Sequence, residues 1–174
     1  MPRVTKEQMK RDEEKVIKIL STKANESIDS IAKQCGFSRQ KAWRIIKNLE
    51  KNKTIWGYHA VADMEKLNLK TFYMLIKATP EPAEEAAKKL ISKEVGELAN
   101  KMGVTVECSS YLHGGFDWII VFYGKDLKQA KRFEQILYKT YPNFLETTVL
   151  LEELFPLKHC GFYHPQIDKI KEFL

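Results

Sequence analysis

The sequence of 174 residues predicts an α+β protein, with an N-terminal winged helix-turn-helix domain joined to a ferredoxin-like (βαββαβ) domain. Three observations lead to this fold class. Residues 27–51 have the pattern of two helices around a glycine turn, residues 52–63 change to an extended pattern, and from Thr71 strands and helices alternate. The expected segments are the winged helix-turn-helix domain at residues 1–54, a hinge strand and linker at 55–69, the ferredoxin-like domain at 70–156 and a C-terminal extension at 157–174.

The N-terminal domain is expected to begin with a helix that Thr5 caps and that runs to about Leu20. Its first half is mostly charged, whereas its second half is apolar enough to pack on the helices that follow. The small residues at 21–27 predict a short connection, so three helices form one unit.

The helical pair at 27–51 has a cap at the start of each helix. Ser27 and Ser38 can accept hydrogen bonds from the free N–H groups of the two first turns. Gly36 lies between the helices and tolerates the positive φ that a sharp reversal needs. Apolar residues supply the wedge between the two helices: Ile31, Cys35, Phe37, Ala42 and Ile45.

The second helix of the pair has a cationic outer face. Between Lys33 and Lys53 there are seven Lys or Arg residues and one acid, Glu50. A helix of this kind can enter the major groove, so Gln40 and Arg44 are expected at base edges. An ordinary helical hairpin with a solvated charged face is the alternative. The candidate DNA-binding residues are Ser38, Arg39, Gln40, Lys41, Trp43, Arg44 and Lys47, the last of them on phosphate.

After Lys51 the apolar pattern changes from helical to extended. Ile55, Trp56, Tyr58 and Val61 predict a wing-like strand that leads out of the helical unit. The sequence leaves two roles open for Trp56 and Tyr58: contact with DNA, or packing between domains or subunits.

The second half predicts the six elements of a ferredoxin-like domain in order. The turn residues Gly103 and Pro142 end its two helices, Asp126 caps the second of them, and Gly114 and Gly115 mark a hairpin. The expected elements are a strand at 71–79, a helix at 81–102, strands at 104–114 and 116–124, a helix from Leu127 to Tyr141, and a strand at 144–155.

The strands at 71–78 and 116–123 have apolar or aromatic residues on both of their faces. Two helices cover only one face of a ferredoxin-like sheet, so the other face needs a partner. A symmetric dimer would cover it and would also double the number of recognition helices.

Composition limits the other classes of function. The net charge of +6 and the sequence pI of about 9.1 favour a polyanionic partner. Three unevenly spaced cysteines, Cys35, Cys108 and Cys160, do not form a disulfide framework and favour a reducing cytoplasm. No segment is apolar over the roughly 18 residues that a membrane span requires, so a soluble intracellular protein is expected.

Together, the motifs resemble those of the Lrp/AsnC family of bacterial and archaeal transcription regulators, and the archaeal type in particular. The resemblance extends from about Val16 to Leu154. It includes SIAKQCGFSRQKAWRIIKNLE, then IWGYHAVAD, then HGGFDWIIVF. It implies a winged-helix DNA-binding domain and a ferredoxin-like regulatory domain, the RAM domain, that forms dimers or larger homo-oligomers.

The resemblance also implies a site for an amino acid or another small molecule at a glycine-containing loop between subunits. By position, the matching residues are Gly114, Gly115, Phe116 and Asp117, where the Asp117 carboxylate could accept a ligand ammonium group. The alternative is a hairpin in which Asp117 accepts local N–H groups. The chain departs from the family pattern at Phe116, where Tyr is usual, in its long helix at 81–102, and in its C-terminal extension.

Two other functions compete with DNA binding. Siroheme decarboxylases are similar in architecture to this family, but only His59 remains where those enzymes have a basic hinge, so we expect no catalytic residues and no cofactor. The extension contains His159, Cys160 and His164, but no second cluster completes a tetrahedral metal site, so no metal is expected either.

Overall fold

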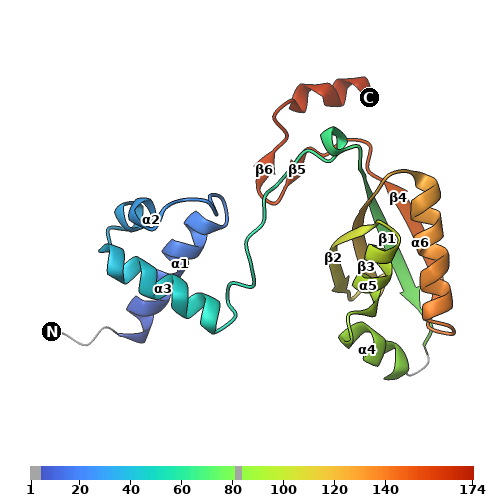
Figure 1. The fold of residues 1–174 in the computed structure, drawn as a ribbon, viewed down its shortest axis with the longest axis horizontal. Coiled ribbons are helices and arrows are strands. Elements are labelled where there is room, and N and C mark those ends of the chain that lie inside the picture. Colours follow the sequence, from blue (N-terminus) through green and yellow to red (C-terminus); the bar gives the residue numbers. More distant parts are fainter. Residues whose placement is uncertain (1–4, 81–83) are drawn as a thin grey trace. The chain divides into compact units, whose positions relative to one another are not determined.

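The computed structural model describes residues 5–80 and 84–174, which divide into two units that we treat separately (Figure 1). The first unit contains three helices and the second contains a four-stranded sheet with its helices. Within the described residues, no helix is both long and apolar enough to cross a bilayer.

The three helices of the first unit begin where the sequence places their caps. They are α1 (Lys6–Leu20), α2 (Ile28–Cys35) and α3 (Arg39–Lys51). The side chains of Thr5, Ser27 and Ser38 each accept a backbone hydrogen bond from the first turn, which confirms the predicted caps. Gly36 adopts φ 70° at the end of α2, so the turn uses the conformation that glycine favours.

One apolar cluster holds these helices together. Val16 from α1 and Ile31 from α2 are almost fully buried, together with Ile46 and Leu49 from α3. Ala42 is fully buried as well, and its small side chain lets α3 approach its neighbours closely. The buried faces of α2 and α3 therefore agree with the helical pattern of the sequence.

The strand predicted at residues 55–61 is wrong. Residues 55–63 have no regular structure, and no strand of the described part of the chain pairs with them. Ile55 instead packs on the helical core, and its N–H donates to the carbonyl oxygen of Leu49 at 3.0 Å. Trp56 is 93% exposed. An extended apolar pattern forms a strand only where another strand satisfies its backbone groups.

The second unit has the predicted ferredoxin-like sheet. Its strands are β1 (Lys70–Ala78), β2 (Thr105–Tyr111), β3 (Trp118–Gly124) and β4 (Leu145–Glu152). They are antiparallel in the order β2-β3-β1-β4 (Figure 1). The first and last strands of the βαββαβ unit therefore lie side by side, and the hairpin β2–β3 lies next to β1.

The single helix predicted at 81–102 is interrupted. The structure has α4 (Glu84–Ile91) and α5 (Glu94–Lys101) instead, with Lys93 at φ 64° between them. Residues 81–83, at the predicted start, lie outside the described residues. Ile91, an apolar residue of the predicted helix, is 79% exposed.

A change of helical phase explains the interruption. Ala86 is buried and Leu90 packs against the core, and the next core residues are Val95 and Ala99. The step from Leu90 to Val95 is five residues, one more than the helical repeat allows on one face. A continuous helix would therefore turn Glu94 toward the core in place of Val95, and the break at Lys93 avoids this.

Helix α6 (Leu127–Thr140) completes the layer that covers the sheet. Asp126 accepts a hydrogen bond from the Gln129 N–H at 2.7 Å, which confirms the predicted cap. Helices α4 to α6 and alternate residues of the strands share one core. Its largest fully buried side chains include Phe72, Met74, Ile76, Trp118, Ile120, Phe122, Phe133, Leu137 and Tyr141.

The opposite face of the sheet is also apolar. The strand registers place the remaining alternate residues there, and among them Val149 is 38% and Leu151 is 47% exposed. In the part of the chain that the structure describes, this open face has seven apolar residues, of which Val121 is buried and Val149 and Leu151 are the exposed ones: Tyr73, Leu75, Ile119, Val121, Tyr123, Val149 and Leu151.

The C-terminal extension forms a small hairpin and a 3-10 helix. The hairpin pairs β5 (Lys158–His159) with β6 (Phe162–Tyr163), and the helix η2 follows at Ile167–Glu172. Another 3-10 helix, η1 (Glu65–Leu67), precedes the sheet. The Nδ1 atom of His164 accepts the Gln166 N–H at 3.1 Å, so this imidazole has a local structural role.

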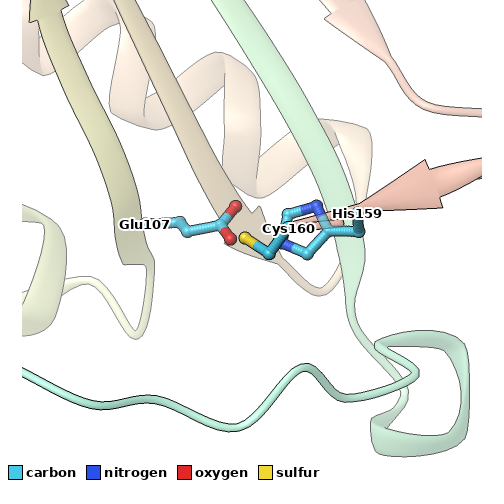
Figure 2. Close-up of side chains that lie close together, drawn as sticks. All are labelled: Glu107, His159 and Cys160. Carbon is cyan, nitrogen blue, oxygen red and sulfur yellow. The ribbon is translucent and has the colours of Figure 1, made fainter. Parts of the chain in front are cut away.

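Figure 2 shows Glu107 of β2 with His159 and Cys160 of the β5–β6 hairpin. Their side chains are of types that bind metals. However, Glu107 belongs to the second unit and the hairpin residues to the first. We therefore assign no metal site to them.

Candidate nucleic-acid interface

The outer face of α3 is an exposed cationic surface of the helical unit. Arg39, Gln40, Trp43, Arg44 and Lys47 are all exposed, whereas the apolar side chains of α3 face α1 and α2. The Ser38 hydroxyl accepts the Lys41 N–H at 3.3 Å, so this serine starts the helix. The geometry therefore brings five of the seven predicted residues to one surface.

Gln40, Trp43 and Arg44 lie on this face in the first two turns of α3. Within residues 5–80 and 84–174, the side chains of Gln40 and Arg44 make no hydrogen bond or ion pair. Trp43 is 50% exposed. These side chains can therefore contact another molecule without first breaking an interaction within the protein.

Arg39 and Lys47 each pair with an acid on the surface. The Arg39 guanidinium lies 3.3 Å from an Asp29 carboxylate oxygen, and both side chains are largely exposed. Lys47 Nζ lies 2.7 Å from Glu50 Oε2. Exposed pairs of this kind contribute only about 0–1 kcal/mol, so either cation can exchange its carboxylate for a phosphate.

The residues after α3 are tied to its end. The Tyr58 hydroxyl donates to Glu50 Oε1 at 3.1 Å. Burial raises the pKa of Tyr58, and the hydrogen bond to Glu50 raises it further. Hydrogen bonds from Lys47 and Tyr58 lower the pKa of Glu50. This contact gives Tyr58 a structural role within the helical unit.

Lys41 differs from the other predicted residues because its ammonium group points toward α1. Its Nζ atom lies 2.7 Å from Asp12 Oδ2 and 4.1 Å from the centre of the Phe37 ring. The Lys41 side chain is 35% exposed, and that of Asp12 is only 4% exposed. We therefore interpret Lys41 as a residue that positions α3 rather than as a phosphate contact.

Asp12 is a buried acid that was not among the predicted residues. Gln8 Nε2 donates to its other oxygen at 2.9 Å. Burial by itself would raise the pKa of Asp12, but hydrogen bonds from Lys41 and Gln8 and the charges of Lys41 and Lys15 lower it below the ordinary value. Asp12 precedes the buried Val16 by one helical turn, so the sequence spacing indicates that Asp12 lies on the buried face of α1.

The glycine-containing loop of the second unit lies between β2 and β3. Gly114 has φ 146°, and both Gly114 and Gly115 are exposed. Asp117 Oδ2 accepts the Ala78 N–H at 2.9 Å and lies 3.1 Å from Lys77 Nζ.

Asp117 therefore fastens this loop to the end of β1. Its N–H also donates to the Ile76 carbonyl oxygen at 2.9 Å. The Ala78 N–H, and then Lys77, lower the pKa of the Asp117 carboxyl group, so the carboxylate is the favoured form. This arrangement differs from the local hairpin contact that the sequence left open for Asp117, because the N–H group that its carboxylate accepts belongs to β1. Phe116 beside it is half-buried.

Comparison with known proteins gives one family match. Residues 13–55 match the family described as winged helix-turn-helix DNA-binding. No curated protein matches the sequence. The matched range contains the end of α1, the whole of α2 and α3, and every residue of the outer face described above.

Solved structures share the fold of nearly the whole chain. The crystal structure of PH0061 has a TM-score of 0.70 and 20% identity, over 91% of this chain and 98% of that one. Transcriptional regulator NMB0573 from Neisseria meningitidis, solved as an L-Met complex, has a TM-score of 0.66 and 15% identity over 94% and 98%. An AsnC family transcriptional regulator from Agrobacterium tumefaciens has a TM-score of 0.63 and 19% identity over 86% and 92%. At these identities the likeness concerns the fold, and it agrees with the predicted two-domain architecture.

Proposed function

We propose that this chain, which has a winged helix-turn-helix DNA-binding domain and the fold of Lrp/AsnC regulators, is a sequence-specific DNA-binding transcription regulator of that family. The observation that supports this most strongly is the outer face of α3. Its side chains can form bidentate hydrogen bonds to bases, as Arg does with guanine and Gln with adenine. The same observations favour a regulator over a siroheme decarboxylase, and a regulator of this kind is expected in the cytoplasm.

The roles of the α3 residues follow from their surroundings. We expect Gln40 and Arg44 at base edges, because neither side chain is engaged within the described part of the chain. Trp43 would pack against the groove wall or a thymine methyl group. Arg39 and Lys47 would exchange their exposed carboxylate partners for phosphates.

Selection of binding sites from random-sequence DNA tests this function. We expect the protein of 174 residues to enrich a shared sequence over several rounds at fixed salt. A pool that stays as diverse as the input would contradict sequence-specific binding.

We further propose that the open face of the sheet forms a homodimer. Val149 and Leu151 are exposed apolar residues in the second half of β4, and a partner would remove them from water. Val149→Lys combined with Leu151→Lys should convert the oligomer into a monomer, because four buried ammonium groups would face one another across a two-fold interface. Light scattering after size exclusion measures the mass.

The control for this prediction is a double charge change away from the sheet. Lys131→Glu with Lys139→Glu alters two exposed residues of α6 and should leave the mass unchanged. If the β4 variant keeps the mass of the unmodified protein, the open face is not the interface.

We also propose an amino acid or a similar small metabolite as effector, bound at Gly114, Gly115, Phe116 and Asp117. The fold likeness to NMB0573, which was solved with L-Met, supports an amino acid as the first class to test. Exposed Gly114 and Gly115 allow backbone N–H groups to approach a ligand carboxylate. The lowered pKa of Asp117 favours its charged form, and this carboxylate could bind the ammonium group of the ligand.

Asp117→Asn is the variant that separates this role from the structural one. The Asn side-chain oxygen can still accept the Ala78 N–H, so the loop should stay fastened to β1. We expect at least one member of a panel of L-amino acids to raise the melting temperature of the unmodified protein but not that of the variant. A panel without any shift, or an equal shift in both proteins, would contradict an effector site at Asp117.

A further inference from the structure

A hollow with three cationic side chains lies at the start of α6, in the sheet unit. Its volume is about 420 Å³, and Lys125, Lys128 and Arg132 contribute the charged side chains of its lining. Lys128 and Arg132 are four residues apart and therefore lie on one face of the helix, roughly 6 Å apart at their Cβ atoms.

The neutral and acidic groups around this hollow are already engaged. Asp126 caps α6 through the Gln129 N–H. The side-chain oxygen of Gln129 accepts the Lys125 N–H at 2.6 Å, and its nitrogen donates to the Met102 carbonyl oxygen at 2.7 Å. The side chains of Asp126 and Gln129 therefore form hydrogen bonds with backbone groups and not with the three cationic side chains.

The three cationic side chains have no such partner. Among the residues that the structure describes, neither lysine nor Arg132 forms an ion pair, whereas the neighbouring Lys131 pairs with Glu134 at 3.4 Å. All three cations are exposed. An anion could therefore approach them without displacing a carboxylate.

This positive charge is local and does not reflect the composition of the domain. Residues 62–156 contain 14 Asp and Glu but only 12 Lys and Arg, and four of those twelve lie between 125 and 132. The cluster therefore stands out within an acidic part of the chain.

The form of the hollow favours a polyanion over a small ligand. Small-molecule sites enclose most of the ligand surface and contain few charged groups. Here, four of the six lining residues are charged, and the hollow is open to solvent. Exposed cations on long side chains are suited to successive phosphates, which release their counterions on binding.

We propose that Lys125, Lys128 and Arg132 form a second DNA contact, which binds backbone phosphates outside the base pairs that α3 contacts. This inference rests on the proposed function, because it concerns the same DNA. It extends that function by giving the sheet domain a direct role in affinity, without any role in sequence preference.

Two duplexes that contain the selected site test the proposal. The short duplex contains only the site, and the long duplex adds about two helical turns of unrelated sequence on each side, at roughly 10.5 base pairs per turn. The test variant combines Lys125→Gln, Lys128→Gln and Arg132→Gln. The control variant removes the same charge elsewhere in the unit through Lys66→Gln, Lys88→Gln and Lys139→Gln.

We expect the unmodified protein and the control variant to bind the long duplex at least tenfold more tightly than the short one in low salt. The test variant should bind both duplexes with the affinity that the unmodified protein has for the short one. Its salt slope on the long duplex, log K against log salt, should become shallower by about 0.9 for each phosphate that it no longer neutralises, or roughly 2–3 for each protomer bound.

Equal binding of both duplexes by the unmodified protein would overturn this second contact, and so would a test variant that behaves like the control. A protein that binds neither duplex would contradict the proposed function itself. The two failures are therefore distinguishable.

Discussion

Arg44→Ala should weaken binding to the selected DNA site by about 1–3 kcal/mol and should relax the preference for one base pair in each half-site. Arg44 lies on the exposed face of α3 and has no partner among the described residues, so its guanidinium can form two parallel hydrogen bonds to one guanine. Titration of the selected duplex and of its single-base variants, at fixed salt, measures both effects.

Two controls distinguish base recognition from the removal of a charge. Arg11→Ala removes an exposed arginine of α1 and should leave affinity and base preference unchanged. Lys47→Ala should weaken binding to all sequences alike, because a phosphate contact contains no sequence information. If Arg44→Ala behaves like either control, Arg44 does not contact a base.

Lys41→Met should lower the free energy of unfolding by about 3 kcal/mol, because it leaves the Asp12 carboxylate buried without its cation. Gln8 still donates one hydrogen bond to Asp12, but a neutral amide does not replace a charge. Urea unfolding at pH 7, followed by far-ultraviolet circular dichroism, measures the change.

The two partners of this pair should not be equivalent. Asp12→Asn should cost only about 1 kcal/mol, because Lys41 is 35% exposed and can extend its ammonium group into water. Asp12 has no such route, since its side chain is 4% exposed. Equal destabilisation by Asp12→Asn and Lys41→Met would contradict the asymmetry.

The pair should also make stability depend on pH in acid. The pKa of Asp12 is lower in the folded protein than the ordinary value of 3.8, so the unfolded chain binds the proton first as the pH falls. The stabilisation by the pair is therefore fully present above about pH 4, and it disappears as the pH falls through the folded pKa. The difference in stability between the unmodified protein and Asp12→Asn should shrink over that range.

The parts of the fold that were predictable from the sequence are those that local chemistry determines. Ser27, Gly36 and Ser38 define the helical pair because caps and positive φ depend on a few neighbouring residues. The sheet order follows from the order of its elements, since short connections leave few arrangements.

The errors arose where distant residues decide the structure. The extended pattern at 55–61 has no partner strand within the described chain, and sequence periodicity does not show whether a partner exists. The interruption at Lys93 depends on how two helical faces meet the sheet, although the five-residue step from Leu90 to Val95 was visible in the sequence.

The candidate site shows the same division. The exposed face of α3 follows from helical periodicity, so Gln40, Trp43 and Arg44 could be predicted from the sequence. The role of Lys41 could not be predicted, because its partner Asp12 lies 29 positions earlier, on another helix.

The fluorescence of Trp43 tests most directly whether DNA covers the outer face of α3. Trp56→Phe removes the most exposed of the three tryptophans. Of the two that remain, Trp118 is only 2% exposed and Trp43 is 50% exposed. Acrylamide quenching of this variant therefore reports mainly on Trp43. We expect the selected duplex to reduce the quenching constant severalfold, and an unrelated duplex to reduce it much less. Quenching that stays unchanged when the protein is saturated with its selected site would contradict DNA binding through α3.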